Sequence, residues 1–115
     1  MKISLQNKKA LIGGSSKGLG FAVAEQLALS GAQVTIVSSN EKLLKERVFR
    51  LNKITSQKHN FLVCDYNDYD SYSKKITDYF DTNTIDILVN NTQGPIAGDV
   101  NSVSINDYQN AFDLL

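Results

Sequence analysis

Short apolar runs alternate along the chain with segments in which apolar residues recur every three or four positions. The pattern predicts strands over residues 9–12, 33–37, 60–64 and 85–89, and helices over residues 18–30, 41–52, 68–80 and 104–115. Strands separated in this way by helices pair in parallel, because right-handed crossovers place the helices on the faces of the sheet. The chain is therefore predicted to be a single α/β domain over residues 1–115, with the order βαβαβαβα.

The same periodicity indicates how the predicted helices pack and where they end. We expect the packed side of the first helix to carry five apolar residues: Leu19, Ala22, Val23, Ala24 and Leu27. The third helix is expected to pack through Tyr72, Ile76 and Phe80. Gly31 is a suitable residue to end the first helix, and Asn40 is a good N-cap for the second.

A glycine-rich segment joins the first predicted strand to the first predicted helix. A strand that turns directly into a helix presents free backbone N–H groups and the positive end of the helix dipole to a pyrophosphate. Gly14 permits a positive φ at the turn, Gly18 lets phosphates approach the backbone, and Gly20 allows close packing of the helix. The spacing GxxxGxG matches neither GxGxxG nor the P-loop, so a structural turn without a ligand stays open as the alternative.

Charge and residue composition argue against several classes of function. The 115 residues include 12 basic and 12 acidic side chains, which gives no electrostatic footprint for nucleic acid or an anionic membrane. The N-terminal segment has no apolar stretch typical of a secretion signal, so we expect a cytoplasmic location. Cys64 and His59 are the only residues of their types, which argues against a disulfide framework or a zinc site.

Three motifs in this order resemble the N-terminal half of a short-chain dehydrogenase/reductase. They are the glycine turn of residues 14–20, Asp65 after the third strand, and the Asn-Asn-x-x-Gly segment of residues 90–94 after the fourth. The amino-acid sequences of the turn and of the loop after Asn91 are most similar to those of members of the β-ketoacyl-carrier-protein-reductase type. The resemblance implies a Rossmann-type sheet with helices on both faces, and an oxidoreductase that transfers hydride between NAD(P) and a small carbonyl or alcohol substrate. It also allows a homo-oligomer.

The resemblance also implies roles for individual residues. The adenosine ribose and the pyrophosphate would be lined by residues of the glycine turn: Gly14, Ser15, Ser16, Lys17, Gly18, Leu19 and Gly20. Asp65 would accept a hydrogen bond from the adenine amino group, unless it is simply a solvated loop carboxylate. Asn90 would bond across to the glycine turn and to the ribose of the cofactor, although Asn90 and Asn91 also suit an ordinary turn.

The end of the second strand bears on the choice between NADP and NAD. Ser38, Ser39 and Asn40 follow it, and none is the carboxylate that would bind a ribose 2′-hydroxyl and repel a 2′-phosphate. These three could donate to a phosphate, and Lys17 stands where NADP-using relatives often have a basic residue. Ser39 departs from the pattern, because such relatives often place Arg there. NADP is therefore predicted over NAD, with a solvent-facing Lys17 as the alternative.

The catalytic residues of the resembled family are missing from this sequence. They are a Ser after a fifth strand and a Tyr followed four residues later by Lys, whereas none of the 5 tyrosines here has that Lys. The Asn that the family carries on its fourth helix would fall on Leu115. We therefore expect no catalytic residue here, and interpret the chain as part of a longer oxidoreductase, with an unpaired edge at the fourth strand.

Two other function classes stay open. The first is a non-catalytic nucleotide-binding module or a degenerate remnant, which would bind the dinucleotide without turnover. The second is an unrelated flavodoxin-like or regulatory α/β domain, in which the glycines are purely structural.

Overall fold

A parallel sheet of four strands forms the centre of the structure, a computed structural model that describes residues 3–92, 102 and 104–114. The strands are β1 (Lys9–Ile12), β2 (Gln33–Ser38), β3 (Asn60–Val63) and β4 (Ile87–Val89). They lie in the order β3-β2-β1-β4. β1 pairs with β2 from Lys9↔Gln33 to Ile12↔Ile36 and with β4 from Ala10↔Ile87 to Ile12↔Val89. The prediction of a parallel α/β fold is confirmed.

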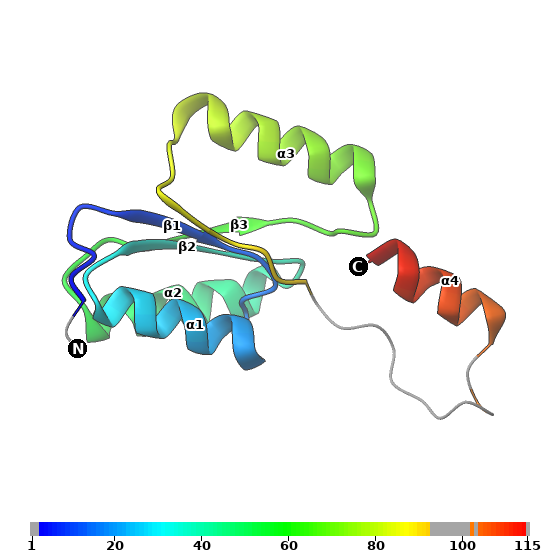
Figure 1. Cartoon of the computed structure of the whole chain (residues 1–115), viewed down its shortest axis with the longest axis horizontal. Coiled ribbons are helices and arrows are strands. Elements are labelled where there is room, and N and C mark those ends of the chain that lie inside the picture. Colours follow the sequence, from blue (N-terminus) through cyan, green and yellow to red (C-terminus); the bar gives the residue numbers. More distant parts are fainter. Residues whose placement is uncertain (1–2, 93–101, 103, 115) are drawn as a thin grey trace.

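Helices cover both faces of this sheet (Figure 1). α1 (Gly18–Leu29) and α2 (Glu41–Ile54) lie side by side on one face, and α3 (Tyr69–Thr82) lies over the other. α4 (Ile105–Leu114) lies apart from the sheet, beyond the C-terminal ends of the strands. The order βαβαβαβα is the predicted one, and most observed bounds fall within two residues of the predicted ones.

Each face of the sheet has its own hydrophobic core. On the side of α1 and α2, Ile12, Val34 and Ile36 pack against Leu44 and Leu51, and all five are fully buried. On the side of α3, Leu11, Val37 and Cys64 meet a group of half-buried side chains that includes Tyr72, Ile76 and Tyr79. The two cores exist because neighbouring residues of a strand point to opposite faces, and both faces of β1 and β2 are covered.

The packed faces of α1 and α3 match the predicted ones in part: Ala24, Leu27, Tyr72 and Ile76 pack as predicted. α1 buries Gly20, Phe21, Ala24 and Ala28, whereas Leu19 is 75% exposed. Small residues at 20, 24 and 28 let the helix approach the sheet closely, so they define the contact stripe instead of the larger Leu19. In α3 the packed residue of the last turn is Tyr79, seven positions after Tyr72, and Phe80 is 43% exposed.

The helix ends follow the predicted chemistry. Gly31 follows the C-cap Ser30 with φ 107°, and the N–H of Ala32 donates to the Leu27 carbonyl as the chain reverses into β2. The Asn40 side chain caps α2 by accepting from the Leu43 N–H at 3.1 Å. These two caps fix both ends of the connection from α1 through β2 to α2.

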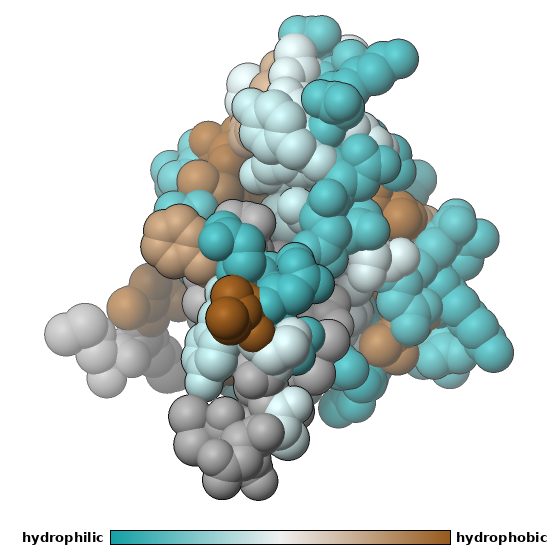
Figure 2. All heavy atoms as spheres, turned by 90° about the vertical axis from the view of Figure 1, so that its right-hand side faces the viewer, coloured by the Kyte–Doolittle hydropathy of each residue, from teal (hydrophilic) through white to brown (hydrophobic). Residues whose placement is uncertain are grey.

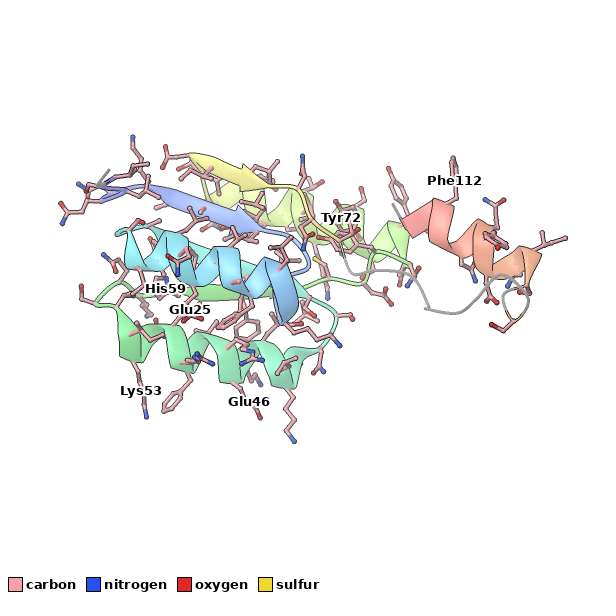
Figure 3. The ribbon with its side chains drawn as sticks, turned by 60° about the horizontal axis from the view of Figure 1, so that its bottom comes forward. Glu25, Glu46, Lys53, His59, Tyr72 and Phe112 are labelled. Carbon is pink, nitrogen blue, oxygen red and sulfur yellow. The ribbon has the colours of Figure 1, made fainter. Side chains whose placement is uncertain are left out.

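Apolar residues remain exposed at the outer parts of the fold. β4 is an edge strand in the described part of the chain, and Leu88 in its middle is 56% exposed. Ile105, Tyr108 and Phe112 of α4 are 88%, 54% and 80% exposed, and Phe112 points away from the sheet (Figure 3). Seen from this end, hydrophobic residues stand among hydrophilic ones (Figure 2). None of the described helices combines the length and hydropathy that crossing a membrane requires.

His59 is a buried polar residue that ties α2 to β2. Its Nδ1 accepts a hydrogen bond from the Val34 N–H at 3.1 Å, so Nε2 carries the ring proton and faces the Thr55 hydroxyl. The Thr55 hydroxyl in turn donates to the Leu51 carbonyl at 3.3 Å. The ring is only 2% exposed, and burial lowers the pKa of His59 below its ordinary value of 6.5.

Stability is therefore expected to fall with acidification below pH 6.5. The unfolded chain takes up a proton on His59 first, because the folded-state pKa is lower, and the free energy of unfolding drops by up to about 1.4 kcal/mol per pH unit until the folded-state pKa is reached. His59→Gln, which does not titrate, should lack this component of the slope in urea unfolding between pH 7.5 and 5.5. Equal slopes for both proteins would contradict the assignment.

Candidate functional site

In the structure the glycine turn extends over residues 13–18, between β1 and α1, and three neighbouring elements hold it in place. From β2, the Val37 carbonyl accepts from the Ser15 N–H at 2.9 Å, and the Val37 N–H donates to the Ser15 hydroxyl at 2.9 Å. That hydroxyl donates to the Ile12 carbonyl at 2.7 Å. Ser15 is 0% exposed, so both its N–H and its side chain are used within the fold. The prediction that Ser15 lines a ligand is therefore corrected: it joins the turn to the sheet.

The second clamp comes from the residue after the one predicted. Asn91, not Asn90, reaches the glycine turn, and its Nδ2 donates to the carbonyls of Gly13 at 3.3 Å and Gly14 at 3.2 Å. Asn90 is exposed and lies at the rim of a cavity. The side chains of residues 90 and 91 point in different directions as the chain leaves β4, so an error of one position exchanges the half-buried amide that bonds to the turn for the exposed one. Gly94 of the same motif lies outside the described residues.

The glycines of the turn have the conformations that the sequence predicts. Gly14 and Gly18 adopt φ of 51° and 63°, which favour glycine, and a Cβ on Gly18 would point into open space. A Cβ on Gly20 would collide with the Gly14 carbonyl oxygen, so the helix packs directly on the turn. A Cβ on Gly13 would likewise collide with the Asn91 carbonyl. The residues that close the turn are thus in backbone contact with it.

The first turn of α1 is left without a side-chain cap. Asn40 and Asp68 cap α2 and α3, whereas Lys17 at the N-cap of α1 makes no capping hydrogen bond. Within the described part of the chain, nothing accepts from the N–H groups of Ser16, Lys17, Gly18 and Leu19. Lys17, Gly18 and Leu19 are exposed, whereas Ser16 is only 7% exposed, so three of the four donors belong to surface residues where the helix dipole is positive. This arrangement suits an anionic group.

Three predicted residues stand beside the turn at the end of β2. Ser38 is 8% exposed, and its hydroxyl accepts from the Asn40 N–H at 3.2 Å. Asn40 uses its side-chain oxygen to cap α2 and keeps its amide NH₂ group, while Ser39 is exposed. Of the three, Ser39 and Asn40 therefore have polar groups open to a ligand, and no carboxylate stands among them.

Asp65 follows β3 in an exposed loop. Its Oδ1 accepts from the Asn67 N–H at 2.9 Å, which forms a local Asx turn. The structure thus gives this carboxylate a role in the loop, and its exposure leaves the other oxygen open.

A cavity of about 510 Å³ lies next to the glycine turn, between the sheet and α3. Its lining includes Gly13, Tyr66, Leu88, Asn90 and Asn91. Burial raises the pKa of Tyr66 to about 12, with smaller contributions from Tyr72 and Cys64, while a hydrogen bond from the Gly14 backbone opposes the shift. The Tyr66 phenol is therefore neutral at physiological pH and holds its proton too tightly to act as a base there.

Two contributors to this site were not predicted from the sequence. Tyr66 adjoins the predicted Asp65, but nothing in the local pattern indicates that its hydroxyl meets the turn. Arg47 of α2 donates from Nε to the Ser16 carbonyl at 2.9 Å, and this contact spans 31 positions of the chain. Only the packing of α2 beside α1 brings these residues together, so short-range periodicity gives no signal for it.

The sheet order, the glycine turn on an uncapped helix and the asparagine that closes it define a Rossmann-type nucleotide-binding protein. The sequence model of the short chain dehydrogenase family matches residues 8–114, and the chain belongs to this family. Among curated relatives, a 3-oxoacyl-(acyl-carrier-protein) reductase of Chlamydia muridarum is 35% identical over 92 residues, and an NAD(+)-linked 15-hydroxyprostaglandin dehydrogenase of Bos taurus is 36% identical over 91. The resemblance to reductases of the acyl-carrier-protein type is thereby confirmed.

A solved structure of the same family superimposes on the whole chain. The L-sorbose reductase of Gluconobacter frateurii, complexed with NADPH and L-sorbose, has a TM-score of 0.85 and 25% identity over 100% of this chain. The matched region is 44% of that enzyme. Likewise, the alignments cover 79% and 76% of this chain but only 37% and 34% of the chlamydial and bovine relatives. The chain thus spans less than half the length of the proteins it matches.

The assignment of the clamp to Asn91 can be tested against its neighbour. Asn91→Ala should lower the free energy of unfolding by about 1–3 kcal/mol, because two carbonyls of the turn lose their donor. Asn90→Ala, at an exposed position, should change it by less than about 0.5 kcal/mol. Urea unfolding of the two variants and the parent chain gives the comparison. A larger loss for Asn90→Ala would restore the original prediction.

Proposed function

We propose that this chain is the NADP-binding part of a short-chain dehydrogenase/reductase that acts on a small carbonyl or alcohol substrate. The observation that carries the proposal is the row of N–H groups at the start of α1 that have no acceptor among the described residues, next to a glycine whose missing Cβ leaves open space. A diphosphate needs several such donors and close access to the backbone. When bound, NADP supplies or accepts the hydride.

The residues of the site fit such a group. The glycine turn is held in place through its carbonyls and through Ser15, so its remaining N–H groups stay in position without the ligand. Ser16, Lys17, Gly18 and Leu19 would contact the diphosphate, with Gly14 and Gly20 setting the shape of the turn. Asp65 would accept from the adenine amino group with its open oxygen. Asn90, at the cavity rim, would face the ribose.

Charge supports NADP over NAD. No carboxylate follows β2 to repel a 2′-phosphate, while Ser39 and the Asn40 amide are open to donate, and Lys17 is exposed beside the turn. The relatives include both cofactor types, since the sorbose reductase is complexed with NADPH and the bovine enzyme is named for NAD(+). The preference therefore depends on this chain's own residues.

Hydride transfer is not proposed for the 115 residues by themselves. None of the 5 tyrosines is followed by Lys at the fourth position, and the one that reaches the glycine turn, Tyr66, has a pKa raised to about 12. The chain should bind the dinucleotide and leave a carbonyl substrate unreduced. The second candidate function, a binding module without catalysis, predicts the same two results for this chain. The two candidates differ only in whether the longer protein catalyses hydride transfer.

Lys17→Glu tests the site without disturbing the helix, since an acidic residue suits the start of α1 but repels a diphosphate. We expect NADPH binding, measured by isothermal titration calorimetry, to weaken by about tenfold or more. Lys58→Glu makes the same change in net charge at the exposed residue just before His59, at the opposite end of the sheet. It should leave NADPH binding within about twofold of the parent value, because exposed charges that far away are screened.

Two results would contradict the proposal. The first is the absence of NADPH and NADH binding to the parent chain at millimolar concentration, which would favour a domain with purely structural glycines. The second is equal weakening by Lys17→Glu and Lys58→Glu, which would reflect net charge rather than a site at the turn.

A further inference from the structure

Arg47 of α2 is held against the glycine turn by two independent contacts. Its Nε donates to the Ser16 carbonyl at 2.9 Å, and its guanidinium carbon lies 4.7 Å from the centre of the Phe21 ring. A cation stacked on an aromatic face and tied to a backbone carbonyl has little freedom left. α1 and α2 run side by side on the same face of the sheet (Figure 3). The hydrogen bond to Ser16 places the Arg47 side chain at the turn.

Arg50, one turn further along α2, shows a different arrangement on the same ring. Its guanidinium carbon lies 5.6 Å from the Phe21 centre, and its Nη2 pairs with the Glu25 carboxylate at 3.7 Å. Among the described residues, Arg47 has no such carboxylate partner. The charge of Arg50 is therefore balanced by Glu25, whereas no carboxylate of the described residues balances the charge of Arg47.

The guanidinium of Arg47 bonds to the carbonyl of Ser16, the residue that precedes Lys17. Ser39, after β2, is exposed and neutral, and Lys17, next to Ser16, is exposed and unpaired among the described residues. Arg47 uses Nε on the Ser16 carbonyl, and its two terminal NH₂ groups have no hydrogen-bond partner in the described part of the chain, which leaves them to a ligand. A guanidinium in this state is suited to a phosphate monoester, which it can bind through two parallel hydrogen bonds.

We propose that Arg47 and Lys17 together form the cationic site for the 2′-phosphate of NADP, so that a residue of α2 supplies the charge that Ser39 does not. This inference rests on the proposed function. It makes Arg47 a determinant of cofactor specificity that acts through one phosphate group only. Loss of its charge should therefore affect ligands with a 2′-phosphate and spare those without it.

The test compares two small probes on the 115-residue chain by isothermal titration calorimetry. Adenosine 2′,5′-bisphosphate carries the 2′-phosphate, and adenosine 5′-monophosphate lacks it. Arg47→Met keeps an apolar side chain of similar length on Phe21, and should weaken binding of the bisphosphate by about tenfold or more while leaving the monophosphate within about twofold. Arg50→Met is the matched control and should change neither. Arg47→Lys, which keeps the charge, should lose less than Arg47→Met.

A second measurement uses the parent chain and does not depend on a variant that folds. The NMR signal of the Arg47 Nε–H group should shift on addition of the bisphosphate and not on addition of the monophosphate. Equal effects of the two probes on this signal, or equal weakening of both by Arg47→Met, would overturn the inference and leave the dinucleotide site in place. Absence of binding of both probes and of NADPH to the parent chain would overturn the proposed function as well.

Discussion

The whole site depends on the fixing of the glycine turn through its carbonyl groups. Asn91 holds the carbonyls of Gly13 and Gly14, and Arg47 holds that of Ser16, while the Ser15 hydroxyl bonds to β1 and β2. A peptide unit held by its carbonyl has its N–H directed to the opposite side. For the Gly13 and Gly14 carbonyls, those N–H groups belong to Gly14 and Ser15, and they bond within the fold to Tyr66 and to the Val37 carbonyl. The N–H opposite the Ser16 carbonyl is that of Lys17, and it has no acceptor among the described residues, at a helix end where an anion is favoured.

Much of this fold could be predicted from the sequence, because the strongest signals are local. The β-branched run at 33–37, the glycines at 14 and 18 and the cap at Asn40 each act within a few residues. The alternation of apolar runs and helical periods gave the order of the elements along the chain, and the glycines gave the position of the turn. Predictions failed where packing between elements decides: the stripe of α1 follows small residues that permit close approach, and Leu19, large and apolar, is left at the surface.

The site residues likewise divide into those that the local sequence predicts and those that depend on packing between elements. Gly14, Gly18 and the exposure of Lys17 follow from local backbone chemistry, whereas the role of Ser15 depends on how β2 lies against the turn. The exchange of Asn90 for Asn91 shows how sharply side-chain direction depends on register, since two identical residues in sequence have opposite environments. The contact of Arg47 with the turn could not be predicted for another reason. Its partner Ser16 is 31 positions away, and no sequence pattern links the two residues.

The hydrogen bonds that fix the glycine turn join residues far apart along the chain, and this spacing has a consequence for how the protein folds. Ser15 finds Val37 after 22 positions, but Gly13 finds Asn91 only after 78. Closing a loop of that size carries an entropic cost and slows folding. The glycine turn is therefore fixed only after the segment that contains Asn91 has reached it. On a ribosome, the first strand and helix emerge long before the asparagine that immobilises their junction. We therefore expect the glycine turn to be the last part of this region to acquire its final shape, although its residues are made first.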